Sequence, residues 1–200
     1  SCPTTHRAWI GVQHLSKICV YSASSDAISP QFFNIARELG RRIAVDGHTL
    51  VYGGGNNGLM GAMAEEVHAF GGEVVGVIPK FMRTHGLAYE KADELIVTAD
   101  MRERKKLMEE LADAFVAMPG GFGTLEEMME VLTLKQLGRH CKPVVFLNAL
   151  RFWEPLADVF EHMYRERFVR PACREMYYFS PDVDDALDHR ANYYAAGPDR

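Results

Sequence analysis

The feature that most constrains the fold of this 200-residue chain is an alternation of short, unbroken apolar runs with longer segments of helical periodicity. Strands that are apolar at every position are typical of a parallel sheet that helices cover on both faces. The alternation therefore predicts an α/β fold with a doubly wound, mostly parallel, Rossmann-like sheet, which binds ligands outside the carboxyl ends of its strands. The predicted strands span residues 17–21, 49–52, 74–78, 95–97, 114–117 and 143–147.

One domain is expected to include residues 16–200, because a chain of this length with 48% hydrophobic residues can bury one substantial core. Residues 1–15 show no clear period, and we interpret them as a leader to which we assign no function. Helices are predicted from Pro30 to Gly47 and from Gly58 to Gly71, over residues 101–111, 125–137 and 153–168, and in a short acidic segment after Pro181.

A long loop is predicted at residues 79–92, and it carries the basic side chains Lys80, Arg83 and His85. Such a loop fits a mobile lid over a ligand, and it fits a solvated connector equally well. The sequence favours neither interpretation.

Charge, hydropathy and cysteine content exclude several classes of protein. The net charge of −5 argues against a nucleic-acid partner, which requires a basic surface. No apolar run reaches membrane-spanning length and no signal-peptide pattern is present, so a membrane partner is not expected. The cysteines form no CxxC pair and no zinc-type spacing, and we interpret them as reduced thiols of a cytoplasmic protein. They are Cys2, Cys19, Cys141 and Cys173.

The glycine-rich loop at residues 119–124 leaves a predicted strand and opens a predicted helix. Unpaired backbone N–H groups and the positive end of the helix can point at an anion there, and glycine lets a phosphate approach the backbone. Thr124 can donate its hydroxyl to the same anion or cap the helix. The loop therefore predicts a phosphate site, and the alternative is a tight turn without a ligand.

The first glycine loop along the chain, Gly53 to Gly58, formally satisfies the dinucleotide pattern GxGxxG, and residues 119–124 form the second glycine loop. That pattern also needs an acidic residue at the end of the next strand to hold the ribose, and this strand ends at Pro79 with its acid, Glu73, at the other end. A nicotinamide enzyme is therefore a minor alternative. Neither loop has the GxxxxGK[ST] lysine of nucleoside-triphosphate P-loops, so no phosphoryl transfer is implied.

Arg104 interrupts an otherwise apolar helical face made by Met101, Met108 and Leu111. A guanidinium on that face must pair with an anion or reach a ligand pocket, because an unpaired buried charge costs several kcal/mol. An internal salt bridge and a place in the site are both open. Lys105 could join Arg104 at the site.

Glu127 shares a helical face with Val131 and Leu134, so it should point inward one turn after the phosphate loop. From there its carboxylate could reach the ribose of a bound mononucleotide. Thr124 and Glu127 also have the spacing of a capping box, in which the glutamate would only bond the backbone of Thr124. The two roles do not exclude each other.

Three motifs in these segments carry a family resemblance: Gly-Gly-Gly-x-x-Gly-Leu-Met-Gly at residues 53–61, Met-x-x-Arg-Lys at 101–105 and Pro-Gly-Gly-x-Gly-Thr-x-x-Glu at 119–127. In their order and spacing the chain resembles the Lonely Guy family of cytokinin-activating phosphoribohydrolases, long labelled lysine decarboxylases in sequence collections. The resemblance extends over roughly residues 17–180. It departs from the family where the first strand ends, because Ser22-Ala23-Ser24-Ser25 replaces the usual Gly-Ser-Ser.

The resemblance implies cleavage of the N-glycosidic bond between the base and ribose 5-phosphate of an AMP-like nucleoside 5′-monophosphate, with no cofactor and no metal. It also implies a homodimer with its sites near the interface. By motif match, the catalytic positions are Arg104 and Glu127, and the phosphate-binding positions are Gly120, Gly121, Gly123 and Thr124. The other positions expected to contact substrate are Ser22, Ser24, Gly54, Gly55, Met101 and Lys105.

A carboxylate beside the sugar suits this reaction, because the transition state has oxocarbenium character and the attacking water must lose a proton. Glu127 is the candidate for that role, with Arg104 orienting it. Two rivals stay open: a carrier that binds a nucleotide or molybdenum cofactor without turnover, and a decarboxylase that needs pyridoxal phosphate on a lysine. The sequence does not identify the base.

Overall fold

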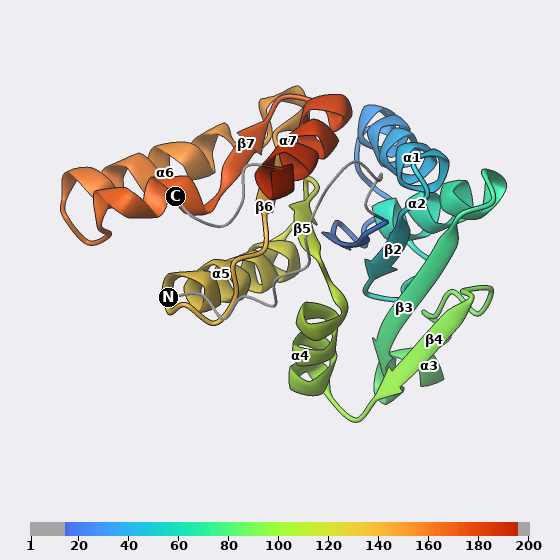
Figure 1. Cartoon of the computed structure of the whole chain (residues 1–200). Helices are drawn as coiled ribbons and strands as arrows, with labels where there is room; N and C mark the ends of the chain where they lie inside the picture. The colour runs from blue at the N-terminus through green and yellow to red at the C-terminus, as the bar shows by residue number, and fades with distance from the viewer. Residues whose placement is uncertain (1–14, 196–200) are drawn as a thin grey trace.

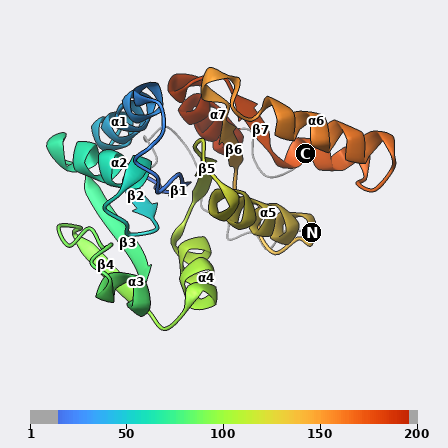
Figure 2. The same cartoon turned by 180° about the vertical axis from the view of Figure 1, so that it is seen from behind.

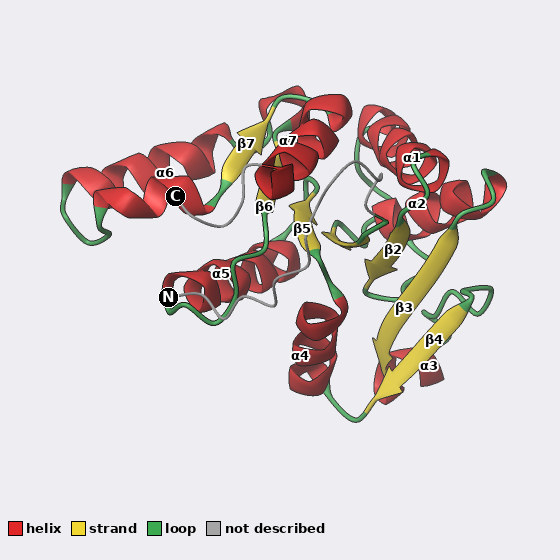
Figure 3. Ribbon diagram, in the orientation of Figure 1, coloured by secondary structure: helices red, strands yellow, loops and turns green. Residues whose placement is uncertain are grey.

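The computed structural model describes residues 15–195, which form a seven-stranded sheet whose neighbouring strands are all parallel. The strand order is β4-β3-β2-β1-β5-β6-β7 (Figures 1 and 3). This order confirms the predicted doubly wound α/β fold. Residues 1–14 of the expected leader lie outside the described residues. The strands are β1 (Lys17–Tyr21), β2 (Thr49–Tyr52), β3 (Glu73–Pro79), β4 (Glu94–Thr98), β5 (Ala114–Ala117), β6 (Val144–Leu147) and β7 (Tyr178–Ser180).

Helices cover both faces of the sheet and divide the core in two (Figures 1 and 2). One cluster packs α1, α2 and α7 on one face, with Ile43 and Met63 fully buried; the other packs α4, α5 and α6 on the opposite face around Met108 and Met128. The helices are α1 (Pro30–Val45), α2 (Gly58–Ala69), α3 (Lys80–Thr84), α4 (Met101–Leu111), α5 (Phe122–Gln136), α6 (Glu154–Arg165) and α7 (Val183–Ala195), with 3-10 turns η1 (Ala149–Arg151) and η2 (Pro171–Met176).

The sheet reverses its winding between β1, the central strand, and its neighbour β5. After β1 the chain moves to β2 on one side, and after β5 it moves to β6 on the other. The loops that leave β1 and β5 therefore diverge at the same edge, where doubly wound sheets bind their ligands. The 119–124 loop lies at this switch point because it directly follows β5.

Several predicted elements have different bounds in the structure. Helix α5 begins at Phe122 rather than near residue 125, because Gly121 takes the N-cap position and Gly123 is accommodated in the first turn. Strand β7 was not predicted, since three residues are too few to show a period. The terminal helix α7 has 13 residues and is not short. The 79–92 loop contains α3, and it joins the first glycine loop through a β-bridge between Gly55 and Ala88.

The cysteines also differ from the expectation of four reduced thiols. Cys19 and Cys173 are free and buried, whereas Cys141 is disulfide-bonded, and Cys2 lies outside the described residues. Spacing alone could not reveal this pairing. Within residues 15–195, no helix is both long enough and apolar enough to span a membrane.

Candidate functional site

The first glycine loop opens α2, but the N-terminal amides of that helix already have protein acceptors. The Gly58 N–H donates to Asp26 Oδ1 at 2.8 Å, and the Leu59 N–H donates to the Ala23 carbonyl at 3.0 Å. A carboxylate of the chain itself therefore occupies the position where an anion would bind. Gly58 is required for packing as well, since its φ is +60° and a Cβ would lie 2.6 Å from the Ala23 carbonyl oxygen.

The second glycine loop opens α5 and leaves its amides available. Among the described residues, no group accepts from the N–H of Phe122, Gly123 or Thr124, and the N-cap Gly121 gives no side-chain cap. A Cβ on Gly121 or Gly123 would meet nothing within 4 Å, so these glycines face open space. This loop, and not the first, has the free donors and the room that a phosphate needs.

Gly120 has a packing role within the same loop. A Cβ on this residue would lie 2.1 Å from Oγ1 of Thr124, whose side chain is buried against the loop. The absence of a side chain at Gly120 therefore lets the Thr124 hydroxyl reach the loop that leaves β5.

Arg104 and Glu127, on separate helices, meet at the base of this loop. Arg104 Nη1 lies 2.9 Å from Glu127 Oε1, and the two side chains are only 8% and 10% exposed. Arg104 Nε also donates to the Val77 carbonyl at 3.0 Å, which fixes the guanidinium against β3. The internal salt bridge considered for Arg104 is thus present, and its partner is the other candidate catalytic residue.

Burial raises the pKa of the Glu127 carboxyl to about 7, although the neighbouring Arg104 guanidinium acts to lower it. A carboxyl with a pKa near neutrality can gain and lose a proton at physiological pH, as a general acid or base must. The capping-box interpretation is wrong, because α5 starts at Phe122 and the Glu127 carboxylate accepts from Arg104 instead of the Thr124 backbone.

Gly53 belongs to the site for a reason that sequence reasoning missed. A Cβ on Gly53 would lie 1.9 Å from Nη2 of Arg104, so the guanidinium occupies the space of the absent side chain. The run of three glycines was visible in the sequence, but spacing could not show that α4 places an arginine against its first member.

Two further residues of α4 were expected to contact substrate. The sulfur of Met101 lies 3.9 Å from Arg104 Nη1, beside the buried pair. Lys105 Nζ lies 2.5 Å from Glu126 Oε1 and 2.6 Å from Glu130 Oε2. Lys105 therefore does not join Arg104 in the structure, and is instead held by two carboxylates of α5.

The remaining candidates lie in the loops after β1 and β2. The Ser22 hydroxyl is buried with no hydrogen-bond partner among the described residues, at the end of the central strand β1. Ser24 is exposed. The carbonyls of Gly54 and Gly55 accept from the Tyr89 N–H and the Tyr52 hydroxyl, so both glycines are tied to their own surroundings.

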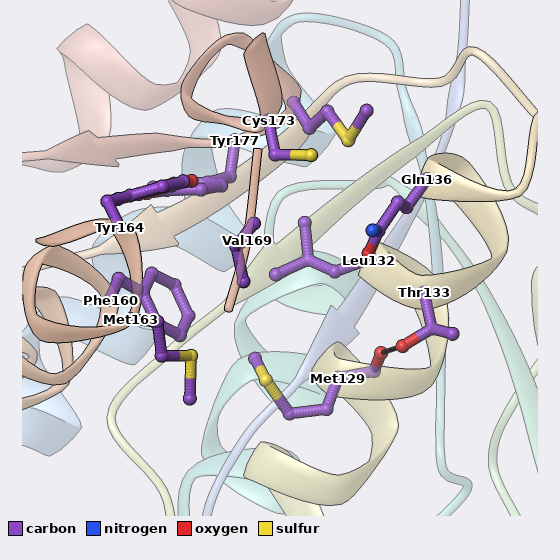
Figure 4. Close-up of a pocket in the computed structure, with 11 residues that line it drawn as sticks. Met129, Leu132, Thr133, Gln136, Phe160, Met163, Tyr164, Val169, Cys173 and Tyr177 are labelled. Atoms are coloured by element: carbon purple, nitrogen blue, oxygen red, sulfur yellow. Dashed lines mark hydrogen bonds between the residues drawn. The ribbon is translucent and has the colours of Figure 1, made fainter. Parts of the chain in front are cut away.

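A cavity of about 180 Å³ lies elsewhere, between α5, α6 and η2 (Figure 4). It is lined by apolar side chains such as Met129, Leu132 and Phe160, and it opens on the side of α5 opposite Glu127. It is therefore separate from the loop and the ion pair. Among residues 15–195, no three His, Cys, Asp or Glu side chains are grouped in a way that could bind a metal.

These features define an α/β protein with free amides at a helix N-terminus and a buried Arg–Glu pair at the switch point of its sheet. The family model described as "possible lysine decarboxylase" matches residues 60–189. The cytokinin riboside 5′-monophosphate phosphoribohydrolase LOG of Oryza sativa subsp. japonica is 41% identical over 86% of this chain and 71% of its own. Its relative LOG3 of Arabidopsis thaliana is 38% identical over 88% and 82%.

The chain therefore belongs to this lysine decarboxylase-like family, the Lonely Guy family. A solved structure of the molybdenum cofactor carrier protein of Chlamydomonas reinhardtii has the same fold, with a TM-score of 0.69 over 91% of this chain and 99% of its own. Its sequence is 24% identical, so this likeness concerns the fold alone.

Proposed function

We propose that the protein hydrolyses the N-glycosidic bond of an adenine-type or cytokinin-type nucleoside 5′-monophosphate, releasing the free base and ribose 5-phosphate. The observation that carries this proposal is the buried Arg104–Glu127 pair beside an anion loop with free amides. The names of the relatives, which are phosphoribohydrolases acting on cytokinin riboside 5′-monophosphates, support the same reaction.

The phosphate is proposed to bind at the N-terminus of α5. The amides of Phe122, Gly123 and Thr124 supply hydrogen-bond donors, and the Thr124 hydroxyl lies close to Gly120. Gly121 and Gly123 leave room for the phosphate oxygens. The helix dipole adds attraction for the dianion, worth about 0.3–1 kcal/mol near a surface. Ser22, with its unpartnered hydroxyl across the switch point, is a further donor for the ribose or the phosphate.

In the proposed mechanism Glu127 faces the sugar one turn below the phosphate. Its ionised carboxylate stabilises positive charge at C1′ as the bond to the base breaks, and then accepts a proton from the water whose oxygen bonds to C1′. The base leaves with the bonding electron pair and takes up a proton. Arg104 holds the carboxylate in place and keeps a useful fraction of it ionised.

The assignment is tested with AMP and the Glu127→Gln variant, following base release by chromatography. Loss of the carboxylate should reduce kcat at least about 100-fold, within the range for a general base. Glu110→Gln is the matched control, because Glu110 lies on the exposed side of α4 and its ion pair within residues 15–195 is with Lys106, at 3.8 Å. Equal rates for wild type and Glu127→Gln would reject the role of Glu127.

The same site separates the enzyme from the carrier alternative. A carrier needs the anion loop but has no use for an inward carboxylate of raised pKa, so the Arg104–Glu127 pair favours turnover. Binding of a nucleotide with no release of base would favour the carrier.

We further propose a homodimer formed through the outer side of α5 and the segment after α6. Phe122, the first residue of α5, and Phe168, after α6, are 95% and 84% exposed, and these apolar side chains are the proposed contact residues. Light scattering should give twice the chain mass, and the double variant Phe122→Ser/Phe168→Ser should shift the equilibrium to monomer. A monomeric wild type would reject the dimer.

A cytoplasmic location stays a prediction, which cell fractionation tests.

A further inference from the structure

Two neighbouring residues of α4 make two separate bridges to α5. Arg104 pairs with Glu127 in the interior, and Lys105, the next residue, contacts Glu126 on the outer side of the same helix. Lys105 also reaches Glu130, one turn further along α5. The inner bridge contains the candidate catalytic pair, and the outer bridge flanks it.

The Lys105 ammonium is already committed to protein partners. Its Nζ lies 2.5 Å from Glu126 Oε1 and 2.6 Å from Glu130 Oε2, which takes two of its three donors. The Lys105 side chain is 17% exposed, while the two glutamates are 55% and 44% exposed, so the cation is the enclosed member of the group. A phosphate that accepted from the third donor would lie beside these two carboxylates, whose negative charges repel it.

We propose that Lys105 is a positioning residue for the proposed hydrolysis: it fixes the first two turns of α5 against α4, so that Glu127 stays within hydrogen-bond distance of Arg104. The proposal rests on the proposed function, and it replaces the direct substrate contact expected from the family motif. A displacement of about 1 Å at a reacting group can cost about 100-fold in rate, so a flanking bridge of this kind affects turnover.

The charges around Glu127 give this proposal a distinctive signature. Arg104 and Lys105 face Glu127 from α4 and lower its pKa, whereas Glu126 on the same helix raises it. The Cys19 and Tyr21 side chains of β1 also face Glu127. They are neutral, because burial raises the pKa of both groups. Removing the Lys105 charge should therefore raise the pKa of Glu127. Neutralising Glu126 should lower it.

The experiment compares Lys105→Met, Lys105→Arg and the double variant Glu126→Gln/Glu130→Gln in the full chain, measuring kcat and KM for AMP across about pH 5 to 9. Lys105→Met should lose about 10-fold in kcat with KM within about 2-fold, and its acid limb should move to higher pH. The double variant should lose kcat similarly while its acid limb moves to lower pH. Lys105→Arg should recover most of the rate by keeping the bridge.

Lys106→Met is the matched control, because Lys106 is 76% exposed and lies 3.8 Å from Glu110; it should behave as wild type. A large rise in KM for Lys105→Met, with no effect of the double variant, would overturn the proposal and restore a substrate contact. If wild type cleaves no monophosphate, the proposed function fails on its own. The carboxyl ¹³C titration of Glu127 then still tests the bridge, and identical midpoints in wild type and Lys105→Met would refute it.

Discussion

The Gly53→Ala substitution should inactivate the protein without unfolding it. The added Cβ would lie 1.9 Å from Arg104 Nη2, whereas ordinary contact begins at 3.4 Å, so the guanidinium must retreat by about 1.5 Å. The displaced group is the far end of a flexible side chain, and Gly53 has no positive φ, so the backbone accepts alanine. The strain therefore falls on Arg104 and its bond to Glu127, which is 2.9 Å long in the wild type.

The expected loss in kcat for Gly53→Ala is about 100-fold, the typical cost of misplacing a catalytic group by about 1 Å. The glycosidase assay with AMP measures it, and thermal unfolding measures the fold. Gly72→Ala is the contrasting control, because its Cβ would lie 2.6 Å from the Ala44 Cβ of α1 and 2.8 Å from Val67 Cγ1 of α2, away from the pair. That variant should lose stability and keep its kcat while folded.

A folded Gly53→Ala protein with wild-type kcat would show that Arg104 is not needed where the structure places it. Loss of stability in Gly53→Ala equal to that in Gly72→Ala would also contradict the reasoning, because the clash would then involve the fold rather than the site.

Three further predictions concern Glu127 and the phosphate loop. Burial raises the pKa of Glu127 in the free protein to about 7 from 4.5, so the active carboxylate is lost as pH falls through 7. The value of kcat/KM, which reports the free enzyme, should therefore drop on the acid side with a midpoint near 7; a midpoint near 4.5 would contradict the burial argument. The raised pKa also means that the folded protein binds this proton more tightly than the unfolded chain does. The contribution of Glu127 to the free energy of unfolding should therefore decline as pH rises from 4.5 to 7 and level off above. Unfolding midpoints of wild type and Glu127→Gln over that pH range measure this decline. Gly123→Ala adds a Cβ that meets no protein atom, so it should stabilise α5 by up to about 1 kcal/mol. If phosphate binds against the Gly123 amide, the same variant should raise KM for AMP about 10-fold. An unchanged KM would place the phosphate elsewhere.

The sequence predicted the parts of this molecule whose signals are local. Apolar runs identified the strands from β1 to β6, because most of these strands are buried on both faces; the edge strand β4 is partly exposed. Helical spacing alone predicted that Glu127 points inward and that the charged Arg104 lies on an otherwise apolar helix face. The spacing of Asp100 and Glu103 likewise predicts the start of α4, and the Asp100 side chain accepts from the amides of Arg102 and Glu103 as its N-cap.

Features that depend on distant contacts could not be predicted in this way. Nothing near Gly58 indicates that Asp26 satisfies its amide, and this contact is what distinguishes the two glycine loops. The partners of Lys105 are 21 and 25 residues away along the chain, so its place outside the buried pair was invisible. Strand β7 is too short to show a period, although Phe179 stacks on Phe146 at 5.0 Å between ring centroids.

The most direct test of the central claim is a side-by-side incubation of the wild-type protein with AMP and with adenosine, quantifying adenine and ribose 5-phosphate. If the N-terminus of α5 holds the phosphate and Glu127 acts on the sugar below it, AMP should yield the two products in equal amounts and adenosine should yield almost none. Cleavage of adenosine as fast as AMP would remove the phosphate from the account. No base release from any nucleoside 5′-monophosphate would contradict the hydrolase assignment itself.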